Sequence, residues 1–128
     1  MLIGNHSVVN TTPHDITIIG VSGATVTIPT SGVLVRLSSR SGHWEIHMGD
    51  IKIFARDTLV GVSLEEDGSS FSFDAIPERP TTFYIVSGIV GRHLKERSDI
   101  LIPMNDPNDD PIRNDNGHIV AVRGLKRP

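Results

Sequence analysis

One segment of the chain has the residue types and spacing of a metal site. His43, Glu45 and His47 alternate along a predicted strand, so their side chains would project from one face of a sheet. Two imidazoles and a carboxylate can bind zinc or iron, but the sequence identifies no further ligand to complete the set. A solvated or interfacial strand face is the simpler interpretation. We therefore assign no metal site, and a chelator series would test that choice.

The segment 105–111 begins like a calcium-binding loop. Asp106, Asn108 and Asp110 supply oxygen ligands at alternate positions. Pro111 then replaces the glycine that makes the sharp turn of such loops, and Gly117 stands where the final glutamate is required. The sequence therefore predicts a solvated loop here.

Complete catalytic motifs are absent from the sequence. It has no G-x-S-x-G elbow, no Ser-x-x-Lys pair, no Walker loop, no G-x-G-x-x-G and no cysteine. A catalytic triad assembled only in space leaves no such signature, so an enzyme stays an alternative. We assign no catalytic residue, and capture of a ligand is the favoured class of function.

The segment 82–88 is predicted to be a strand that enters the one helix of the chain. Free backbone N–H groups at a helix start attract anions such as phosphate, and Gly88 permits close approach. An ordinary cap by Ser87 is the simpler interpretation. Of the adjacent aromatic residues Phe83 and Tyr84, one can belong to the core while the other stacks on a base.

Arginine side chains suited to phosphate are scattered through the sequence. Their planar, permanently charged groups match the geometry of a phosphate. Each one alone is most simply a surface residue. They are Arg56, Arg92, Arg97, Arg113 and Arg123.

Several short strands must position these residues in the N-terminal half of the chain. Apolar stretches rich in β-branched residues, separated by Gly, Ser, Asp or Pro, are typical of antiparallel strands. Pro13 would place the first strand at a sheet edge or bend it. The predicted strands are 8–19, 24–29, 33–38, 43–48, 51–56 and 58–64.

The C-terminal region of the chain follows a Pro-bounded connector, 77–80. Ile89, Val90 and Leu94 recur at helical spacing. The dipeptide Asn116-Gly117 predicts a type I′ hairpin turn. The predicted elements are the strand 82–86, a helix of at most about three turns, the extended piece 100–103 and the hairpin 112–123.

The fold class expected from these elements is mainly β or α+β. We expect an antiparallel sheet of about six short strands, followed by one helix and a C-terminal hairpin. The length of 128 residues favours a single domain, 1–128. Within it we expect a β-rich region over residues 1–76 and a strand-helix-hairpin region over residues 81–128.

Composition narrows the partners and the compartment. The absence of cysteine fits a reducing cytoplasm. A net charge of −3 disfavours generic binding to DNA or RNA. No apolar run approaches the roughly 20 residues of a membrane span, so we expect no membrane partner.

Four segments of the sequence carry a resemblance to a known family. They are VNTTPHDI (9–16), FYIVS (83–87), RSDILIP (97–103) and IRNDNGHIV (112–120). Together they resemble small phage and prophage proteins, and in length and layout the chain is most similar to the Thoeris anti-defence sponges of the first described type. The likeness covers nearly the whole chain.

The resemblance implies capture of a signal without chemistry. Such proteins bind the cyclic ADP-ribose isomers made by bacterial TIR immune enzymes and withhold them from their effector. They form homodimers or larger symmetric oligomers with pockets completed by neighbouring subunits, and some also take up cyclic oligonucleotides at separate sites. The resemblance implies no cofactor, and a location in the cytoplasm of the bacterial host.

The pocket of that family uses arginines, an aromatic residue and polar groups. His93 stands where an uncharged hydrogen-bonding residue is expected. The alternative functions are an enzyme that acts on a cyclic nucleotide and a small structural or interaction protein of a virion. By position in the matching segments, the implied ligand-binding residues are Arg56, Phe83, Tyr84, Arg92, His93, Arg113 and Asn114.

Overall fold

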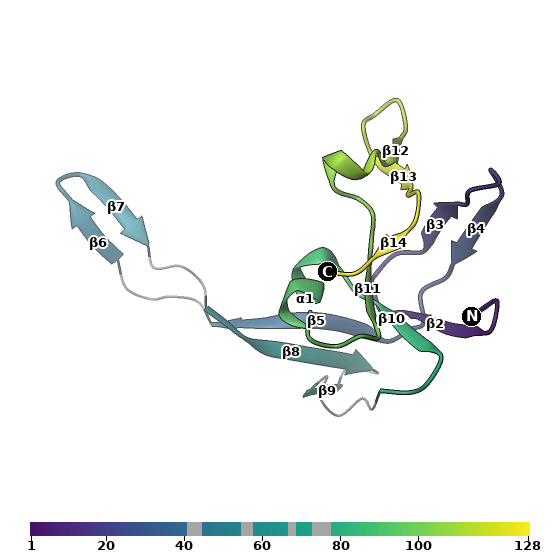
Figure 1. Ribbon diagram of the computed structural model, residues 1–128. Helices are drawn as coiled ribbons and strands as arrows, with labels where there is room; N and C mark the ends of the chain where they lie inside the picture. The colour runs from purple at the N-terminus through teal and green to yellow at the C-terminus, as the bar shows by residue number, and fades with distance from the viewer. Residues whose placement is uncertain (41–44, 55–57, 67–68, 73–77) are drawn as a thin grey trace.

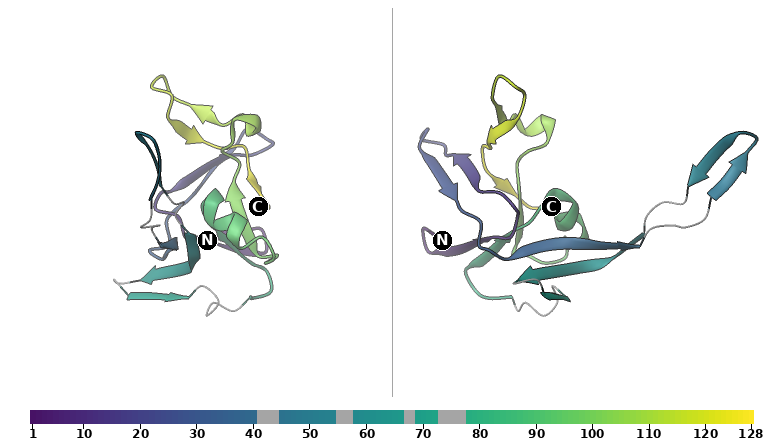
Figure 2. Two further views of the ribbon diagram at one scale, coloured as in Figure 1. Left: turned by 90° about the vertical axis from the view of Figure 1, so that its left-hand side faces the viewer. Right: turned by 180° about the vertical axis from the view of Figure 1, so that it is seen from behind.

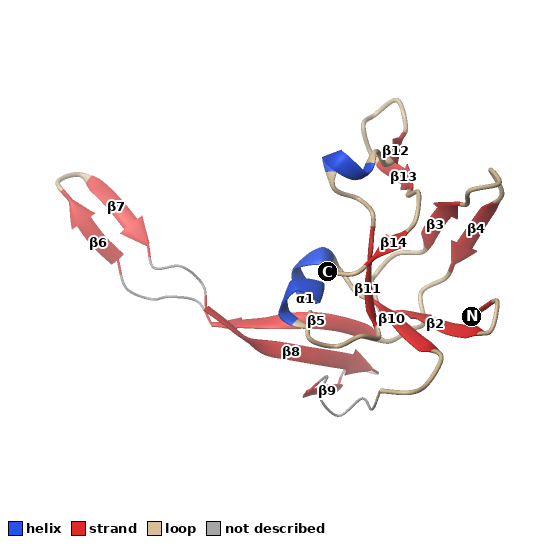
Figure 3. Ribbon diagram, in the orientation of Figure 1, coloured by secondary structure: helices blue, strands red, loops and turns tan. Residues whose placement is uncertain are grey.

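The computed structural model describes residues 1–40, 45–54, 58–66, 69–72 and 78–128. Strands dominate these residues, with one α-helix and one short 3-10 helix, which confirms the predicted mainly β or α+β class (Figure 1, Figure 3). The strands are β1 (Leu2–Ile3), β2 (His6–Asn10), β3 (Ile16–Ile19), β4 (Thr25–Ile28), β5 (Leu34–Arg40), β6 (Glu45–Met48), β7 (Ile51–Phe54), β8 (Thr58–Glu66), β9 (Ser69–Ser72), β10 (Thr82–Ile85), β11 (Ile100–Pro103), β12 (Ile112–Arg113), β13 (Ile119–Ala121) and β14 (Leu125–Lys126). The helices are α1 (Gly88–His93) and the 3-10 helix Pro107–Asp109.

A five-stranded sheet in the order β1-β2-β10-β11-β14 forms the centre of the described structure. Its three middle strands run parallel, with Phe83 opposite Val8 and Tyr84 opposite Ile100. The two edge strands run antiparallel to their neighbours. The sheet is therefore mixed, whereas the sequence predicted antiparallel pairing. Parallel strands need long connections, so the hairpin-like spacing of the sequence could not reveal these pairs.

Two hydrophobic clusters cover the two faces of the central sheet. On one face α1 and β5 pack against the sheet, and on the other the β3–β4 hairpin does so (Figure 2). Successive residues of β10 alternate between them, because side chains along a strand point to opposite faces. The first cluster contains Val35, Tyr84, Val86, Val90, Leu94, Ile100 and Ile102, and the second contains Val8, Ile16, Ile28, Ile85 and Val122. Both predicted regions of the chain thus contribute to one sheet and to both clusters.

The first predicted strand, 8–19, is two strands in the structure. β2 ends at Asn10 and belongs to the central sheet, whereas β3 begins at Ile16 and pairs with β4. Pro13 lies in the loop between them, so the predicted bend is a complete change of sheet. The sequence also did not predict β1, β9 and β14, each of which has at most four residues.

The β12–β13 hairpin turns through a loop that differs from the predicted type I′ turn. Gly117 has φ 81°, but Asn116 does not adopt a positive φ. Oδ1 of Asn114 accepts hydrogen bonds from the backbone N–H groups of Asn116 (3.0 Å) and His118 (3.0 Å). The N–H of Gly117 donates to the carbonyl of Asn114 (2.9 Å). These bonds favour a three-residue loop in which glycine is the one left-handed residue.

The helix α1 is six residues long, within the predicted limit. Ser87 occupies the N-cap position, but its side chain makes no capping hydrogen bond. A Cβ on Gly91 would lie 2.5 Å from Cγ2 of Ile102 and 3.2 Å from Cγ of Pro128. Glycine therefore lets the helix lie close to β11 and to the last residue of the chain. No helix among the described residues has the length and apolar character of a membrane span.

Candidate functional site

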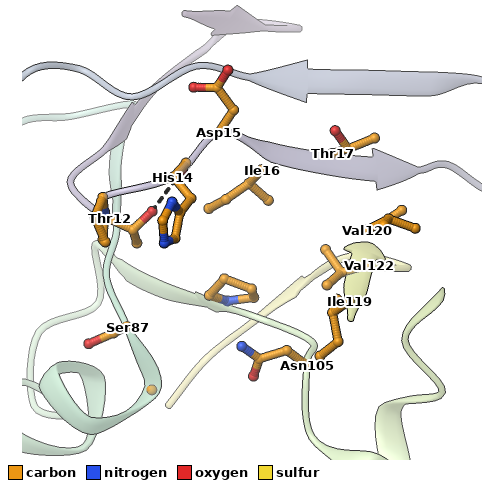
Figure 4. A pocket seen from close by; sticks show the side chains of 14 residues that line it. Thr12, His14, Asp15, Ile16, Thr17, Ser87, Asn105, Ile119, Val120 and Val122 are labelled. Carbon is orange, nitrogen blue, oxygen red and sulfur yellow. Dashed lines mark hydrogen bonds between the residues drawn. The ribbon is translucent and has the colours of Figure 1, made fainter. Parts of the chain in front are cut away.

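Two pockets formed by described residues lie at opposite ends of the parallel strands β10 and β11. The arginine pocket, at the amino ends, has a volume of about 430 Å³. The His14 pocket, at the carboxyl ends, has a volume of about 360 Å³ (Figure 4). Glu78, Arg79, Pro80, Thr81, Thr82, Phe83, Ser98, Asp99 and Arg127 line the arginine pocket. Thr12, Pro13, His14, Asp15, Ile16, Thr17, Ser87, Gly88, Pro103, Asn105, Ile119, Val120, Ala121 and Val122 line the His14 pocket.

Two exposed guanidinium groups mark the arginine pocket. Nη1 of Arg127 donates a hydrogen bond to the carbonyl of Ser98 (2.8 Å), which holds the end of the chain beside the segment that precedes β11. The side chain of Arg79 makes no hydrogen bond to any described residue. Guanidinium groups bind phosphate oxygens through paired N–H donors. The pocket can therefore present both groups to an anion.

Phe83 provides the aromatic surface of the arginine pocket. Its side chain is half-buried, and its ring centroid lies 5.4 Å from that of His6 at an interplanar angle of 46°. Tyr84, the next residue, is buried in the first hydrophobic cluster. Successive side chains of a strand point to opposite faces, so the two aromatic side chains lie on different sides of β10. Phe83 lines the arginine pocket, whereas Tyr84 belongs to the core and lines neither the arginine pocket nor the His14 pocket.

Asp99, in the wall of the arginine pocket, forms an ion pair with Arg97. Nε and Nη2 of Arg97 donate to Oδ1 (2.9 Å) and Oδ2 (2.6 Å) of Asp99, and the two side chains are only 15% and 7% exposed. The hydrogen bond to Asp99 raises the pKa of Arg97, so this group stays charged. Oε1 of Glu78 lies 3.9 Å from Nε of Arg97. Because Arg97 neutralises Asp99, the remaining charges of the wall are two guanidinium groups and the Glu78 carboxylate.

Thr81 in the wall of the arginine pocket has a strained backbone. Its φ is 61°, a region that β-branched residues rarely adopt. The N–H of Ser7 donates to the carbonyl of Thr81 (2.8 Å), which ties this residue to β2. Such strain costs about 1–3 kcal/mol and is concentrated at functional sites. The loop 78–81 is therefore held in a conformation that its sequence does not favour.

The buried side chain of Asn10 shapes one wall of the His14 pocket. Its Nδ2 donates to the carbonyls of His14 (2.8 Å) and Ile28 (3.1 Å), and its Oδ1 accepts from the backbone N–H of Thr12 (3.0 Å). Asn10 is 1% exposed. The Asn10 amide can donate two hydrogen bonds and accept two, and these bonds fix the loop between β2 and β3. This loop is therefore preformed.

The His14 pocket contains the helix start that the sequence marked as a candidate anion site. Ser87 and Gly88 line it, but no lysine or arginine does so, and Asp15 adds a carboxylate. The helix α1 is too short for a strong dipole, with six residues. These features disfavour an anion beside Ser87.

Of the described residues implied by the resemblance, Phe83 alone lines either of these two pockets. Phe83 lines the arginine pocket, whereas Arg92 and His93 are exposed at the end of α1. Arg113 and Asn114 are exposed in the β12–β13 hairpin. Nη1 of Arg113 donates to the carbonyl of Gly117 (2.8 Å), and Asn114 shapes the hairpin loop. Arg56 and Tyr84 complete the set, and Arg56 lies outside the described residues.

The sequence did not single out Arg79 or Arg127 as binding residues. Arg79 lies in the connector that was interpreted as a boundary, and Arg127 is next to the end of the chain. The pairing of β10 with β11 and of β11 with β14 brings them to one pocket. The prolines on both sides of Arg79 are the one sequence signal of a rigid loop there.

The two candidate metal segments have different outcomes. His43 lies outside the described residues, and the side chains of Glu45 and His47 are not described either. In the segment 105–111, Nζ of Lys126 lies 2.9 Å from Oδ2 of Asp106 and 2.6 Å from Oδ2 of Asp109. Within the described portion of the chain, no three His, Asp or Glu residues gather as metal ligands do. Lys126 therefore holds the predicted solvated loop in place through these two ion pairs.

Comparisons of the chain with protein-family models, curated proteins and solved structures find no match. The resemblance to the sponge family therefore depends on the four sequence segments alone.

Proposed function

We propose that the protein captures a cyclic nucleotide signal of the cyclic ADP-ribose class and withholds it without cleaving it. The observation that carries the proposal is the arginine pocket, which Phe83, Arg79 and Arg127 line together. An aromatic ring stacks on a base, and guanidinium groups bind a diphosphate. In this proposal the protein acts in the cytoplasm of a bacterial host against TIR-based immunity.

The energetics of capture favour a site between two copies of the chain. Nanomolar retention requires about 12 kcal/mol of binding free energy. A ligand of about 35 heavy atoms supplies roughly 10–11 kcal/mol at 0.3 kcal/mol per atom, so it must be almost fully enclosed. A second copy could add the exposed side chains of Arg92, His93, Arg113 and Asn114. These residues need not meet Phe83 within one chain.

Release of bound ligand by heat tests the proposal. The purified protein is mixed with cyclic ADP-ribose isomers and separately with cyclic oligonucleotides, free ligand is removed, and the protein is denatured by heat. We expect the intact cyclic ADP-ribose isomer in the released fraction. A chemically altered product would support the alternative enzyme, and no released ligand would favour the structural protein of a virion.

Substitutions locate the site in the same assay. Phe83→Ala and Arg113→Ala should each weaken retention without unfolding the protein, since both side chains are at least partly exposed. Arg79→Ala and Arg127→Ala test the pocket that the structure adds. Arg123→Ala is the matched control, because this exposed arginine pairs with Asp110 (3.1 Å) away from the pocket residues. Nanomolar retention by both Phe83→Ala and Arg113→Ala would overturn the assigned site.

A further inference from the structure

The His14 pocket has the construction of a second ligand site. It lies at the carboxyl ends of three parallel strands, since residues after β2, β10 and β11 line it. In open α/β sheets this end of the strands is where ligands bind. The volume of about 360 Å³ is within the range of small-molecule pockets. Its position separates it from the arginine pocket.

Hydrogen bonds hold both walls of the His14 pocket before any ligand binds. Asn10 fixes the loop on one side, and Oδ1 of Asp15 accepts the N–H of Thr30 (2.9 Å). On the other side the N–H of Val122 donates to the carbonyl of Thr17 (2.9 Å), which joins β13 to β3. A preformed pocket binds a ligand without the entropic cost of ordering its own loops.

The lining combines an apolar floor with polar groups that have no partner among the described residues. Figure 4 shows His14 and Ile16 on one wall, with Asn105 and Ile119 on the other. The imidazole of His14 and the amide of Asn105 make no hydrogen bond to any described residue. Sites that orient a small ring compound typically have an apolar cavity with a small number of polar groups that point into it.

The charged groups around the His14 pocket determine which ligand charges it can accept. Neither lysine nor arginine lines the pocket, and the carboxylate of Asp15 accepts the N–H of Thr30 and points away from the cavity (Figure 4). A phosphate, a carboxylate or an organic cation would therefore lose its hydration without meeting a group of opposite charge. A neutral ring would instead bury its body against Ile16, Ile119 and Val122 and direct its polar edge to His14 or Asn105.

From these observations we infer that the His14 pocket binds a small, neutral ring compound that carries no phosphate. This site is independent of the proposed nucleotide capture at the arginine pocket. It has a different ligand chemistry and no shared lining residue.

Three ring compounds of matched size test the inference. Benzamidine is a cation, benzamide is neutral and benzoate is an anion, so the series varies charge with little change in shape. Each is titrated at pH 7 into the full-length ¹⁵N-labelled protein, and the amide signals of Thr17, Ser87, Ile119 and Val120 are followed. Compounds of this size bind at about millimolar affinity. We expect benzamide to shift these signals, and benzamidine and benzoate to bind at least about fivefold more weakly.

One variant assigns the effect to this pocket, and another is its control. Asp15→Asn keeps an oxygen acceptor for Thr30, and it should leave the order of the three compounds unchanged because this side chain points away from the cavity. Ile119→Asp changes a residue that is 39% exposed, so the fold should tolerate it while benzamide binding is lost. The inference is overturned if benzamide does not shift the wild-type signals, if benzoate or benzamidine binds as strongly as benzamide, or if Ile119→Asp leaves benzamide binding unchanged. Because the nucleotide release assay is separate, either proposal can fail alone.

Discussion

The arginine pocket and the His14 pocket are built at opposite ends of the same parallel strands, but they are stabilised in different ways. The arginine pocket has a buried ion pair between Arg97 and Asp99 and a strained residue, Thr81. The His14 pocket depends on a neutral, fully buried amide, Asn10, and has apolar walls. The comparison indicates how one small sheet can present a cationic site at one end and an apolar site at the other.

Removing the buried cation should have the largest effect. Arg97→Met leaves Asp99 buried without its partner, and we expect the free energy of unfolding to fall by about 3 kcal/mol. Chemical denaturation measures the change, and retention of cyclic nucleotide should fall with it. Arg123→Met is the control, because its pair with Asp110 is exposed and should contribute less than about 1 kcal/mol. Equal losses in both variants would contradict the structural role of the buried pair.

The second prediction concerns Asn10. Asn10→Ala removes the partners of the His14 and Ile28 carbonyls, so the free energy of unfolding should fall by about 2 kcal/mol. Benzamide binding should weaken more than nucleotide retention does, because Asn10 holds the loop that carries His14. Asn105→Ala, on the exposed side of the same pocket, should leave stability unchanged within about 0.5 kcal/mol. If Asn10→Ala impaired only the nucleotide, the two pockets would not be independent.

The third prediction is a gain in stability. Thr81→Gly relieves the positive φ, so we expect an increase of about 1 kcal/mol in thermal or chemical denaturation. If the strain serves the site, nucleotide retention falls although the protein becomes more stable. Thr82→Gly, at a regular strand position in β10, should instead destabilise the protein. A loss of stability in Thr81→Gly would show that this backbone is not strained.

The smallest expected effect depends on pH. The hydrogen bond from Lys126 lowers the pKa of Asp109 below its ordinary value of 3.8. A carboxyl group with a lowered pKa stabilises the fold above its ordinary value, and this contribution is lost as pH falls through the folded-state pKa. Amide hydrogen exchange in 105–110 should therefore increase only below about pH 3.8. Asp109→Asn should abolish this acid step, and a step that persisted in the variant would have another cause.

The sequence predicted those helices, strands and turns that depend on neighbouring residues alone. The helix spacing of Ile89, Val90 and Leu94, and the strand over 82–86, follow from residue types alone. The hairpin at Asn116-Gly117 was also expected, but its turn type was wrong because the side chain of Asn114 bonds to two backbone N–H groups. A turn rule based on the two residues Asn116 and Gly117 does not include hydrogen bonds to the side chain of a residue before them.

The candidate site was predictable only to a limited extent. The sequence singled out Phe83 as one of two aromatic residues that could stack, and strand alternation between the two core clusters decided which one reaches a pocket. Arg79 and Arg127 were missed, because nothing in their local sequence distinguishes them from other surface arginines. The Asn10 amide was missed for a similar reason, since its partners include the distant Ile28.

The sequence by itself determined a mainly β chain with one short helix, glycine at a hairpin turn and scattered arginines suited to an anion. Only the tertiary structure decided that β2, β10 and β11 run parallel and thereby create two pockets, one lined by arginines and one largely apolar. The physical reason is the range of the interactions. Side-chain period and turn preference act over a few residues, whereas parallel pairing and buried polar contacts join segments tens of residues apart.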